Sequence, residues 1–295
     1  MKNTLVSIGI ITYNSEKTIL ETLNSAYNQT YKNIELIISD DFSRDNTVNI
    51  CKEWVSEHSS RFVNCFVLTS TQNTGTSANC NRLINYCSGE YLKILAGDDI
   101  FTSTCIEDNI KNIGTSDMQI SDLIRFNSSS LLPYKNPINF NKFCKLPISK
   151  RVHYYARTGF FCNIPTIFLR KSIFDFVGKY DEKSKIFEDV PFLLKVFSSN
   201  AKISYFSKIT VKYREGGISN SNSVKFDKEL LNIFFKYRIK FLHNDSILDR
   251  IVILERRLYN LLLDKKESKT LLLKIYCRIY TKYLKLINSL TFHNS

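Results

Sequence analysis

Two pairs of adjacent carboxylates are the residues whose types and placement most directly suggest chemistry. Asp40 and Asp41 follow the apolar run IELIIS, and Asp98 and Asp99 follow YLKILAG. Oxygen ligands without a neighbouring histidine suit Mg²⁺ or Mn²⁺, and such a cation would allow the acids to bind an anionic ligand. Aspartate is also a common turn residue, so a structural role is the alternative. Two pairs at equivalent strand ends favour a site.

These acids must be positioned by the segments around them. Apolar runs predict strands near 6–12, 34–41, 64–70 and 90–99, and helical spacing predicts helices near 15–30, 45–58 and 77–88. Alternating strands and helices form a parallel sheet covered by helices, with ligands at the carboxyl ends of the strands. Thr12, Tyr13 and Asn14 lie at another such end. We therefore expect these residues and both acid pairs to face one crevice.

Composition limits the classes of protein to which the chain can belong. Of 295 residues, 43% are hydrophobic, and the net charge of +13 favours an anionic partner such as a nucleotide or a membrane surface. No segment has about 18 uninterrupted apolar residues, and the N-terminus is a poor signal peptide. The eight cysteines lack zinc-binding spacing. We expect reduced thiols in a cytoplasmic protein.

Several motifs of other enzyme classes are absent from the sequence. No GxGxxG follows the first predicted strand and no GxxxxGK[ST] occurs, which argues against dinucleotide-binding enzymes and P-loop NTPases. There is no GxSxG or HExxH, and the four histidines are widely spaced. The positive charge is concentrated in the C-terminal part and not around exposed aromatic residues, so nucleic acid is not expected as a partner.

Two long segments together resemble the N-terminal half of family 2 glycosyltransferases. They are VSIGIITYNSEKTILETLNSAYNQTYKNIELIISDDFSRDNT and QNTGTSANCNRLINYCSGEYLKILAGDD, within residues 4–100, and GKYDEKSKIFEDVPFLLKV and VKYREGGIS extend the likeness to about residue 219. The resemblance implies an α/β GT-A fold, with a Rossmann-like, mostly parallel sheet flanked by helices. It divides the chain into a GT-A domain, 1–222, and a helical tail, 223–295. The nucleotide-binding half of that domain covers about 1–100 and the acceptor half about 101–222.

The resemblance also implies roles for individual residues. It assigns Mn²⁺ or Mg²⁺ to Asp98 and Asp99, and the catalytic base to Asp189 with Glu188 beside it. It assigns the nucleotide-sugar donor to Thr12, Tyr13, Asn14, Asp40, Asp41, Asn81, Arg82 and Gly97. Without the resemblance, Glu188 and Asp189 are better explained as acids at the N-terminus of a helix.

Three positions depart from the family pattern. Ala96 replaces the first acid of the metal motif, Cys80 replaces a frequent arginine, and Gly216 replaces a histidine that some members carry. The implied metal shell is therefore sparse, with Asp98, diphosphate oxygens and water.

The tail is basic and amphipathic. Residues 225–295 carry 15 Lys or Arg and 7 Asp or Glu, which gives 15 − 7 = +8. On a helix, Lys274, Arg278, Lys282 and Lys285 share one face, and apolar residues from Leu272 to Leu290 cover the opposite one. Two interpretations are open: the tail binds an anionic membrane surface, or it packs on the catalytic domain or on a second subunit in a homo-oligomer.

The function implied by the resemblance is an inverting glycosyltransferase. It would move a sugar from a nucleotide-sugar, a UDP-sugar by preference, to a saccharide or lipid-linked acceptor in polysaccharide biosynthesis. A peripheral position on the inner face of the cell membrane would follow from a membrane-binding tail. One alternative is a nucleotidyltransferase that makes an NDP-sugar, although TYNSEKT lacks the glycine-rich loop expected for one. The other is a degenerate member that binds a sugar nucleotide or membrane without turnover.

Overall fold

A mixed sheet forms the centre of the protein in the computed structural model, which describes residues 4–127, 130–132, 138–158, 164–185, 187–216, 224–243 and 246–263. The described strands follow the order β3-β2-β1-β4-β8-β6-β9-β5, with β7 paired to β6. Their bounds are β1 Val6–Thr12, β2 Ile34–Asp40, β3 Cys65–Thr69, β4 Tyr91–Ala96, β5 Ile100–Phe101, β6 Met118–Phe126, β7 Leu131–Leu132, β8 Phe168–Arg170 and β9 Ile203–Arg214.

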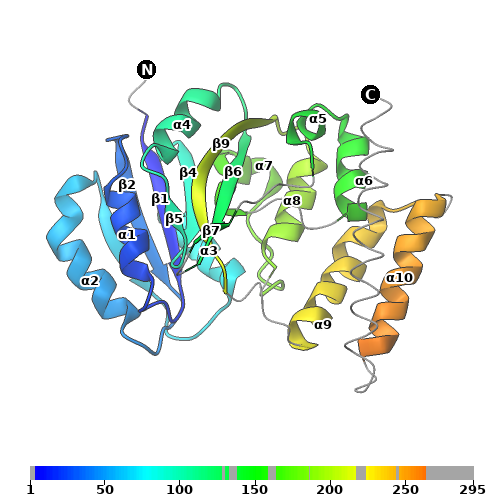
Figure 1. The fold of residues 1–295 in the computed structure, drawn as a ribbon, viewed down its shortest axis with the longest axis horizontal. Helices are drawn as coiled ribbons and strands as arrows, with labels where there is room; N and C mark the ends of the chain where they lie inside the picture. The colour runs from blue at the N-terminus through cyan, green and yellow to red at the C-terminus, as the bar shows by residue number, and fades with distance from the viewer. Residues whose placement is uncertain are drawn as a thin grey trace.

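Helices cover both faces of this sheet and extend beyond its far end (Figure 1). Their bounds are α1 Ile19–Tyr27, α2 Thr47–His58, α3 Thr76–Tyr86, α4 Cys105–Asn112, α5 Phe140–Cys144, α6 Ile148–Thr158, α7 Ile173–Val177, α8 Asp189–Phe197, α9 Val224–Ile233 and α10 Ile247–Leu263. Ile19 of α1 and Trp54 of α2 belong to one buried apolar cluster, and Leu83 of α3 belongs to the other. The two clusters lie on opposite sides of the sheet because alternate residues of each strand point to opposite faces.

The predicted N-terminal elements are confirmed. β3, β2, β1 and β4 pair in parallel, so the ends of β1, β2 and β4 lie side by side, with Thr12 opposite Asp40 and Ile11 opposite Ala96. The first helix begins at Ile19, later than the residue 15 suggested by its apolar spacing, because residues 16–18 form a turn.

The second half of the sheet mixes strand directions. β8 runs antiparallel to both β4 and β6, while β6 and β9 are parallel. A further antiparallel pairing joins β5, which directly follows Asp99, to the end of β9, with Ile100 opposite Lys212. A strand more than a hundred residues later in the chain therefore supports the segment after the second acid pair.

The described part of the tail packs on the rest of the protein. Arg238, which is fully buried, donates from Nε to the carbonyl oxygen of Ala156 in α6 at 2.8 Å. Asp249 of α10 is also buried and accepts from Arg157 of α6 at 2.6 Å. The predicted stripe Lys274, Arg278, Lys282 and Lys285 lies outside the described residues. Among the described helices, none is long and apolar enough to cross a membrane.

Candidate active site

The loops after β1 and β2 are joined through Asp40. Its carboxylate accepts from the Thr12 hydroxyl at 2.8 Å, from the Ser43 amide at 2.8 Å and from the Ser43 hydroxyl at 2.5 Å. Thr12 and Asp40 are both buried at the ends of their strands. Asp40 therefore organises the loop, and its predicted contact with a donor stays a prediction.

Two strained residues occupy the same loops. Asn14 and Phe42 are the described non-glycine residues with positive φ, at 51° and 72°, a region that a bulky side chain rarely adopts. Asn14 donates from its amide to Ser43 Oγ at 2.8 Å and accepts from the Arg44 amide at 2.8 Å. Tyr13, beside it, is 42% exposed and so remains accessible to a ligand.

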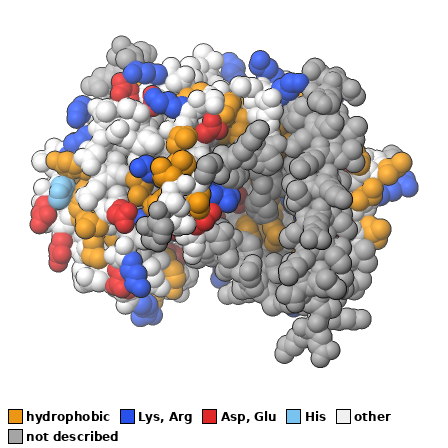
Figure 2. Space-filling view, in the orientation of Figure 1, with side chains coloured by type: hydrophobic (Ala, Val, Ile, Leu, Met, Phe, Trp, Pro, Cys, Tyr) orange, Lys and Arg blue, Asp and Glu red, His pale blue; other side chains and the backbone are white. Residues whose placement is uncertain are grey.

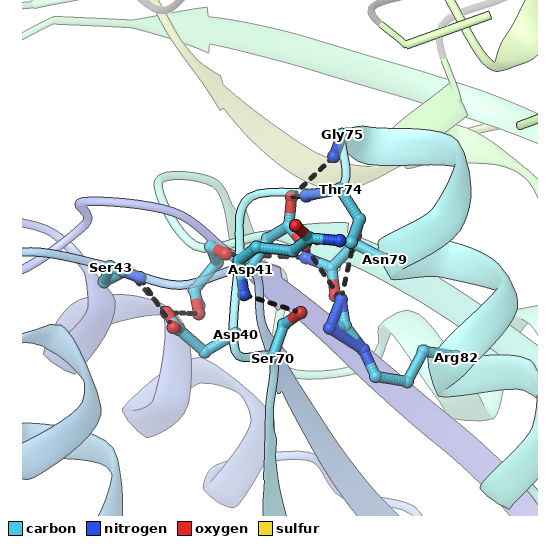
Figure 3. A network of polar contacts seen from close by, with 10 residues as sticks. Asp40, Asp41, Ser43, Ser70, Thr74, Gly75, Asn79 and Arg82 are labelled. Carbon is cyan, nitrogen blue, oxygen red and sulfur yellow. Dashed lines mark hydrogen bonds and ion pairs between the residues drawn. The ribbon is translucent and has the colours of Figure 1, made fainter. Parts of the chain in front are cut away.

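Asp41 fastens the loop before α3 (Figure 3). Its carboxylate accepts from the amides of Thr74 at 2.9 Å and Gly75 at 2.7 Å, and from Arg82 at 2.9 Å. Gly75 has a φ of +89°, and an added Cβ would lie 3.1 Å from the Lys185 carbonyl oxygen, so glycine is required there. The buried Asp41 thus positions both the loop and Arg82.

The turn after β4 separates its two carboxylates. Gly97 allows this turn to approach β1, because an added Cβ would lie 3.0 Å from Thr12 Cγ2. Asp98 is half-buried, whereas Asp99 is 1% exposed and accepts from the backbone amide of Arg214 at 2.8 Å. Burial raises the pKa of both, and the charge of Arg214 opposes the rise. Asp98 is therefore the acid that can reach a ligand.

Glu188 and Asp189 lie at the N-terminus of α8, as N-cap and first residue. Both are half-buried at the polar end of a helix whose Val190, Phe192 and Leu193 are in the core. Burial raises the pKa of both carboxyls, and the neighbouring Asp189 charge raises that of Glu188 further. A hydrogen bond from the Val190 amide favours ionised Asp189. The pair thus holds a proton at a higher pH than an ordinary carboxylate.

Helix α3 connects the two ends of the candidate site. Asn81 donates from Nδ2 to the Tyr180 carbonyl oxygen at 3.0 Å and to Glu182 at 2.9 Å, and it accepts from the Tyr180 amide. It thereby fastens the segment that leads into α8. Cys80, on the same helix, is buried, and burial together with the nearby carboxylates of Glu188 and Asp41 raises the pKa of its thiol.

Few side chains of the described residues are available to the predicted cation. Within the described ranges, no three His, Cys, Asp or Glu side chains are grouped so that they could hold a metal ion. Asp40, Asp41 and Asp99 are engaged in the internal hydrogen bonds described above. Asp98 still fits a cation that takes most of its ligands from a bound diphosphate and from water.

Sequence reasoning missed the residues that hold the predicted ones in place. Ser43 and Thr74 are the partners of Asp40 and Asp41, and Arg214 is the partner of Asp99. Ser43 follows the acid pair directly and could have been suspected as a turn residue. Arg214 carries no comparable signal, because its partner lies 115 residues earlier in the chain.

Known proteins with similar sequences include bacterial glycosyltransferases. A cholesterol galactosyltransferase of Borreliella burgdorferi is 28% identical over 236 residues, which cover 76% of this chain and 64% of that protein. The UDP-Glc:alpha-D-GlcNAc-diphosphoundecaprenol beta-1,3-glucosyltransferase WfaP of Escherichia coli is 29% identical, with coverage of 75% and 82%. The match spans less than two thirds of the first curated relatives, at 64%, 33% and 24% of their lengths.

The fold is also shared with solved structures. Residues 1–349 of S. aureus TarS, in complex with UDP-GlcNAc, align with a TM-score of 0.60 at 22% identity, covering 77% of this chain and 65% of that one. This likeness shows the GT-A fold. The sequence model described as Glycosyl transferase family 2 matches residues 7–178, more than half of the chain. The protein therefore belongs to glycosyltransferase family 2.

Proposed function

We propose that this protein is an inverting glycosyltransferase that moves a sugar from a UDP-sugar to a saccharide or lipid-linked acceptor. The observation that carries the proposal is the position and the raised pKa of Asp189. It is a half-buried carboxylate with a raised pKa at the N-terminus of α8, and α3 fastens the segment before it to the loops at the ends of β1 and β2. Asn81 of α3 contacts the segment before Asp189, and Arg82 of the same helix contacts Asp41 after β2.

The donor occupies the carboxyl ends of β1, β2 and β4 in this proposal. Tyr13 is accessible there, and Arg82 is held at this edge with its Nε buried and without a hydrogen-bond partner in the described part of the chain. A buried donor without an acceptor is costly unless a ligand or water satisfies it. The names of WfaP and of the TarS complex, which include UDP-Glc and UDP-GlcNAc, support a UDP-sugar.

Asp98 would hold Mg²⁺ or Mn²⁺ together with the donor diphosphate. A single protein carboxylate with phosphate oxygens and water is a common arrangement for such hard cations. When bound, the cation offsets the negative charge that develops on the departing diphosphate. Ala96 and Gly216 supply no further ligand, so we expect weak metal binding before the donor arrives.

Asp189 removes the proton from the acceptor hydroxyl as this oxygen attacks the anomeric carbon. The bond to the diphosphate breaks in the same displacement, so the configuration of that carbon inverts. Glu188 keeps its proton while Asp189 is ionised, because two adjacent half-buried carboxylates resist carrying two charges. One base and one displacement require no covalent sugar–enzyme intermediate.

A membrane surface is the proposed location of a lipid-linked acceptor, as the name of WfaP suggests. One face of α10 exposes Ile247, Ile251 and Leu254, by 74%, 47% and 59%, and Arg250 and Arg257 are exposed beside them. Hydrophobic and basic side chains gather over α10 at the right edge of Figure 2. The opposite face of this helix is buried, so the exposed face is available to anionic lipid.

Vesicle sedimentation tests the location. The full chain should sediment with vesicles of anionic phospholipid at low salt and less at high salt, because salt screens the attraction. Replacing Ile251 and Leu254 by Ser should reduce binding at both salt concentrations. A change of oligomeric state in this variant, without loss of vesicle binding, would identify the face as a subunit interface.

A donor panel tests the activity. Nucleotide release is measured for UDP-, GDP-, CDP- and dTDP-linked sugars with Mn²⁺, in the presence of saccharide and lipid-linked acceptors. We expect release of UDP, with at least one UDP-sugar preferred. Formation of an NDP-sugar from a nucleoside triphosphate would favour the nucleotidyltransferase alternative. Tight UDP binding without release from any donor would identify a binding protein, which the departures at Ala96, Cys80 and Gly216 would then explain.

A further inference from the structure

Arg214 ends β9 and contacts both residues of the turn that carries the candidate metal ligand. Its backbone amide donates to Asp99 Oδ1 at 2.8 Å, and its Nε donates to the carbonyl oxygen of Asp98 at 2.8 Å. The side chain and the backbone of one residue thus hold two consecutive residues of the turn. Neither contact uses the carboxylate of Asp98, which stays available to a ligand.

The guanidinium of Arg214 is itself fixed from two other directions. One terminal nitrogen donates to Glu21 of α1 at 2.9 Å, and the planar group lies over the ring of Phe126 with 4.4 Å to the centroid. The side chain is only 21% exposed. The planar guanidinium group of arginine forms several hydrogen bonds at once with little further loss of conformational entropy. Arg214 therefore connects α1, β6 and the turn after β4.

The turn is held before Asp98 as well. The amide of Gly97 donates to the Ile11 carbonyl oxygen at 2.9 Å, and its carbonyl oxygen accepts from Thr18 at 2.8 Å. Asp98 is thus the half-buried residue between two fastened ones. Because no group of three metal-binding side chains surrounds it in the described part, its direction depends on the backbone of this turn.

We infer that Arg214 is a positioning residue, which aims the Asp98 carboxylate at the donor diphosphate and its cation. The inference rests on the proposed function. A second acid and a histidine are absent at Ala96 and Gly216, so Asp98 is the one protein ligand proposed for the cation. Small errors in the direction of the Asp98 carboxylate therefore weaken cation binding directly. Arg214 supplies the rigidity that additional ligands would otherwise supply.

The test compares Arg214→Gln and Arg214→Lys with the matched variant Glu21→Gln. Glu21→Gln removes the ion pair of the guanidinium but leaves both contacts with the turn. Two readouts are used on the full chain. Amide hydrogen exchange of Gly97 and Asp99 is measured without ligand, and Mn²⁺ binding is measured by electron paramagnetic resonance in the presence of saturating UDP.

We expect Arg214→Gln to speed exchange of these amides and to weaken Mn²⁺ affinity by about tenfold, with less than threefold change in UDP affinity without metal. Arg214→Lys keeps the charge but lacks the planar guanidinium group, so its amide exchange and Mn²⁺ affinity should lie between those of the parent and of Arg214→Gln. It replaces the glutamine variant in the test if that variant does not fold. Glu21→Gln should resemble the parent because exposed ion pairs contribute little. Unchanged exchange in both Arg214 variants would overturn the inference, whatever the ligand binding shows. A parent that binds neither UDP nor Mn²⁺ would contradict the proposed function instead.

Discussion

Arg82 donates to the carboxylate of Asp41 at 2.9 Å and joins the end of β2 to helix α3. Asp41 also accepts from two backbone amides of the loop before that helix, Thr74 and Gly75. The carboxylate is buried and all its partners are N–H or O–H donors (Figure 3). Its charge therefore stabilises a loop that would otherwise leave buried donors unsatisfied.

Asp41→Asn should destabilise the protein by about 3 kcal/mol, because the amide removes the charge and turns one acceptor into a donor facing other donors. Urea unfolding measures the change. Glu107→Gln is the control, since it removes a surface carboxylate of intermediate exposure that pairs with Lys111 four residues later on α4 and accepts from the Thr30 hydroxyl. That control should cost much less than Asp41→Asn, because solvent screens the ion pair. Equal losses in the two variants would contradict the role of Asp41.

Asp98→Ala should impair metal-dependent ligand binding, whereas Asp99→Ala should impair stability. Asp98→Ala is expected to keep the parental stability and to lose the metal-dependent part of its UDP affinity, at least about tenfold. Asp99→Ala removes the acceptor of the Arg214 amide and should lower the free energy of unfolding by about 1–3 kcal/mol. Calorimetric titration of UDP with and without Mn²⁺, together with urea unfolding, checks both. Parental metal-dependent affinity in Asp98→Ala would rule out its proposed role.

Asp249 should stabilise the contact between α10 and α6 in a pH-dependent way. It accepts from Arg157 at 2.6 Å and lies 2.7 Å from Nε2 of His153, and after the opposing cost of burial these bonds lower its pKa to about 2. The unfolded pKa is about 3.9, so the stabilisation is present above about pH 4 and is lost as the pH falls towards 2. Asp249→Asn should cost about 3 kcal/mol at neutral pH.

The control for this prediction is Glu255→Gln, whose ion pair with Arg256 stays within α10. Thermal unfolding is followed from pH 7 to pH 3 for the parent and both variants. The difference between the parent and Asp249→Asn should shrink as the solution becomes more acidic. A difference that is constant with pH would show that the charge of Asp249 contributes nothing to the contact.

The N-terminal half of the fold was predictable because its signals are local. The strand at Val6–Thr12 and the acids at Asp40 and Asp98 could be placed from apolar runs that stop at polar residues. The separation of each acid pair could not be predicted in this way. Asp99 turns inward because β9 supplies the Arg214 amide, and that pairing depends on a contact across 115 residues.

The catalytic assignment depended on the family resemblance and not on residue patterns. Glu188 and Asp189 are acids at a helix N-terminus, and that local explanation remains correct in the structure. Burial against the core raises the pKa of both, and the charge of Asp189 raises the pKa of Glu188 further, which no local pattern predicts. The contacts of Asn81 with Tyr180 and Glu182 likewise became visible only in the fold.

The pH dependence of turnover should reflect the Glu188–Asp189 pair. Turnover should fall as the pH is lowered through a pKa above the usual aspartate value of about 3.9, because protonated Asp189 cannot accept a proton. Glu188→Gln should keep this acid limb, since glutamine resembles the protonated glutamic acid. Turnover of UDP-sugar at saturating donor is measured from pH 4 to 9. A limb centred at or below pH 4 would show that no carboxylate with a raised pKa is involved.

Turnover of Asp189→Asn with its preferred UDP-sugar is the most direct test of the proposed mechanism. UDP formation is followed at saturating donor and acceptor, and UDP affinity is measured on the same sample. The mechanism predicts a fall in turnover of about 10²–10⁴-fold, the usual contribution of a positioned base, with UDP affinity within threefold of the parent. Near-parental turnover, or a loss explained entirely by weaker UDP binding, would contradict the assignment of Asp189 as the base.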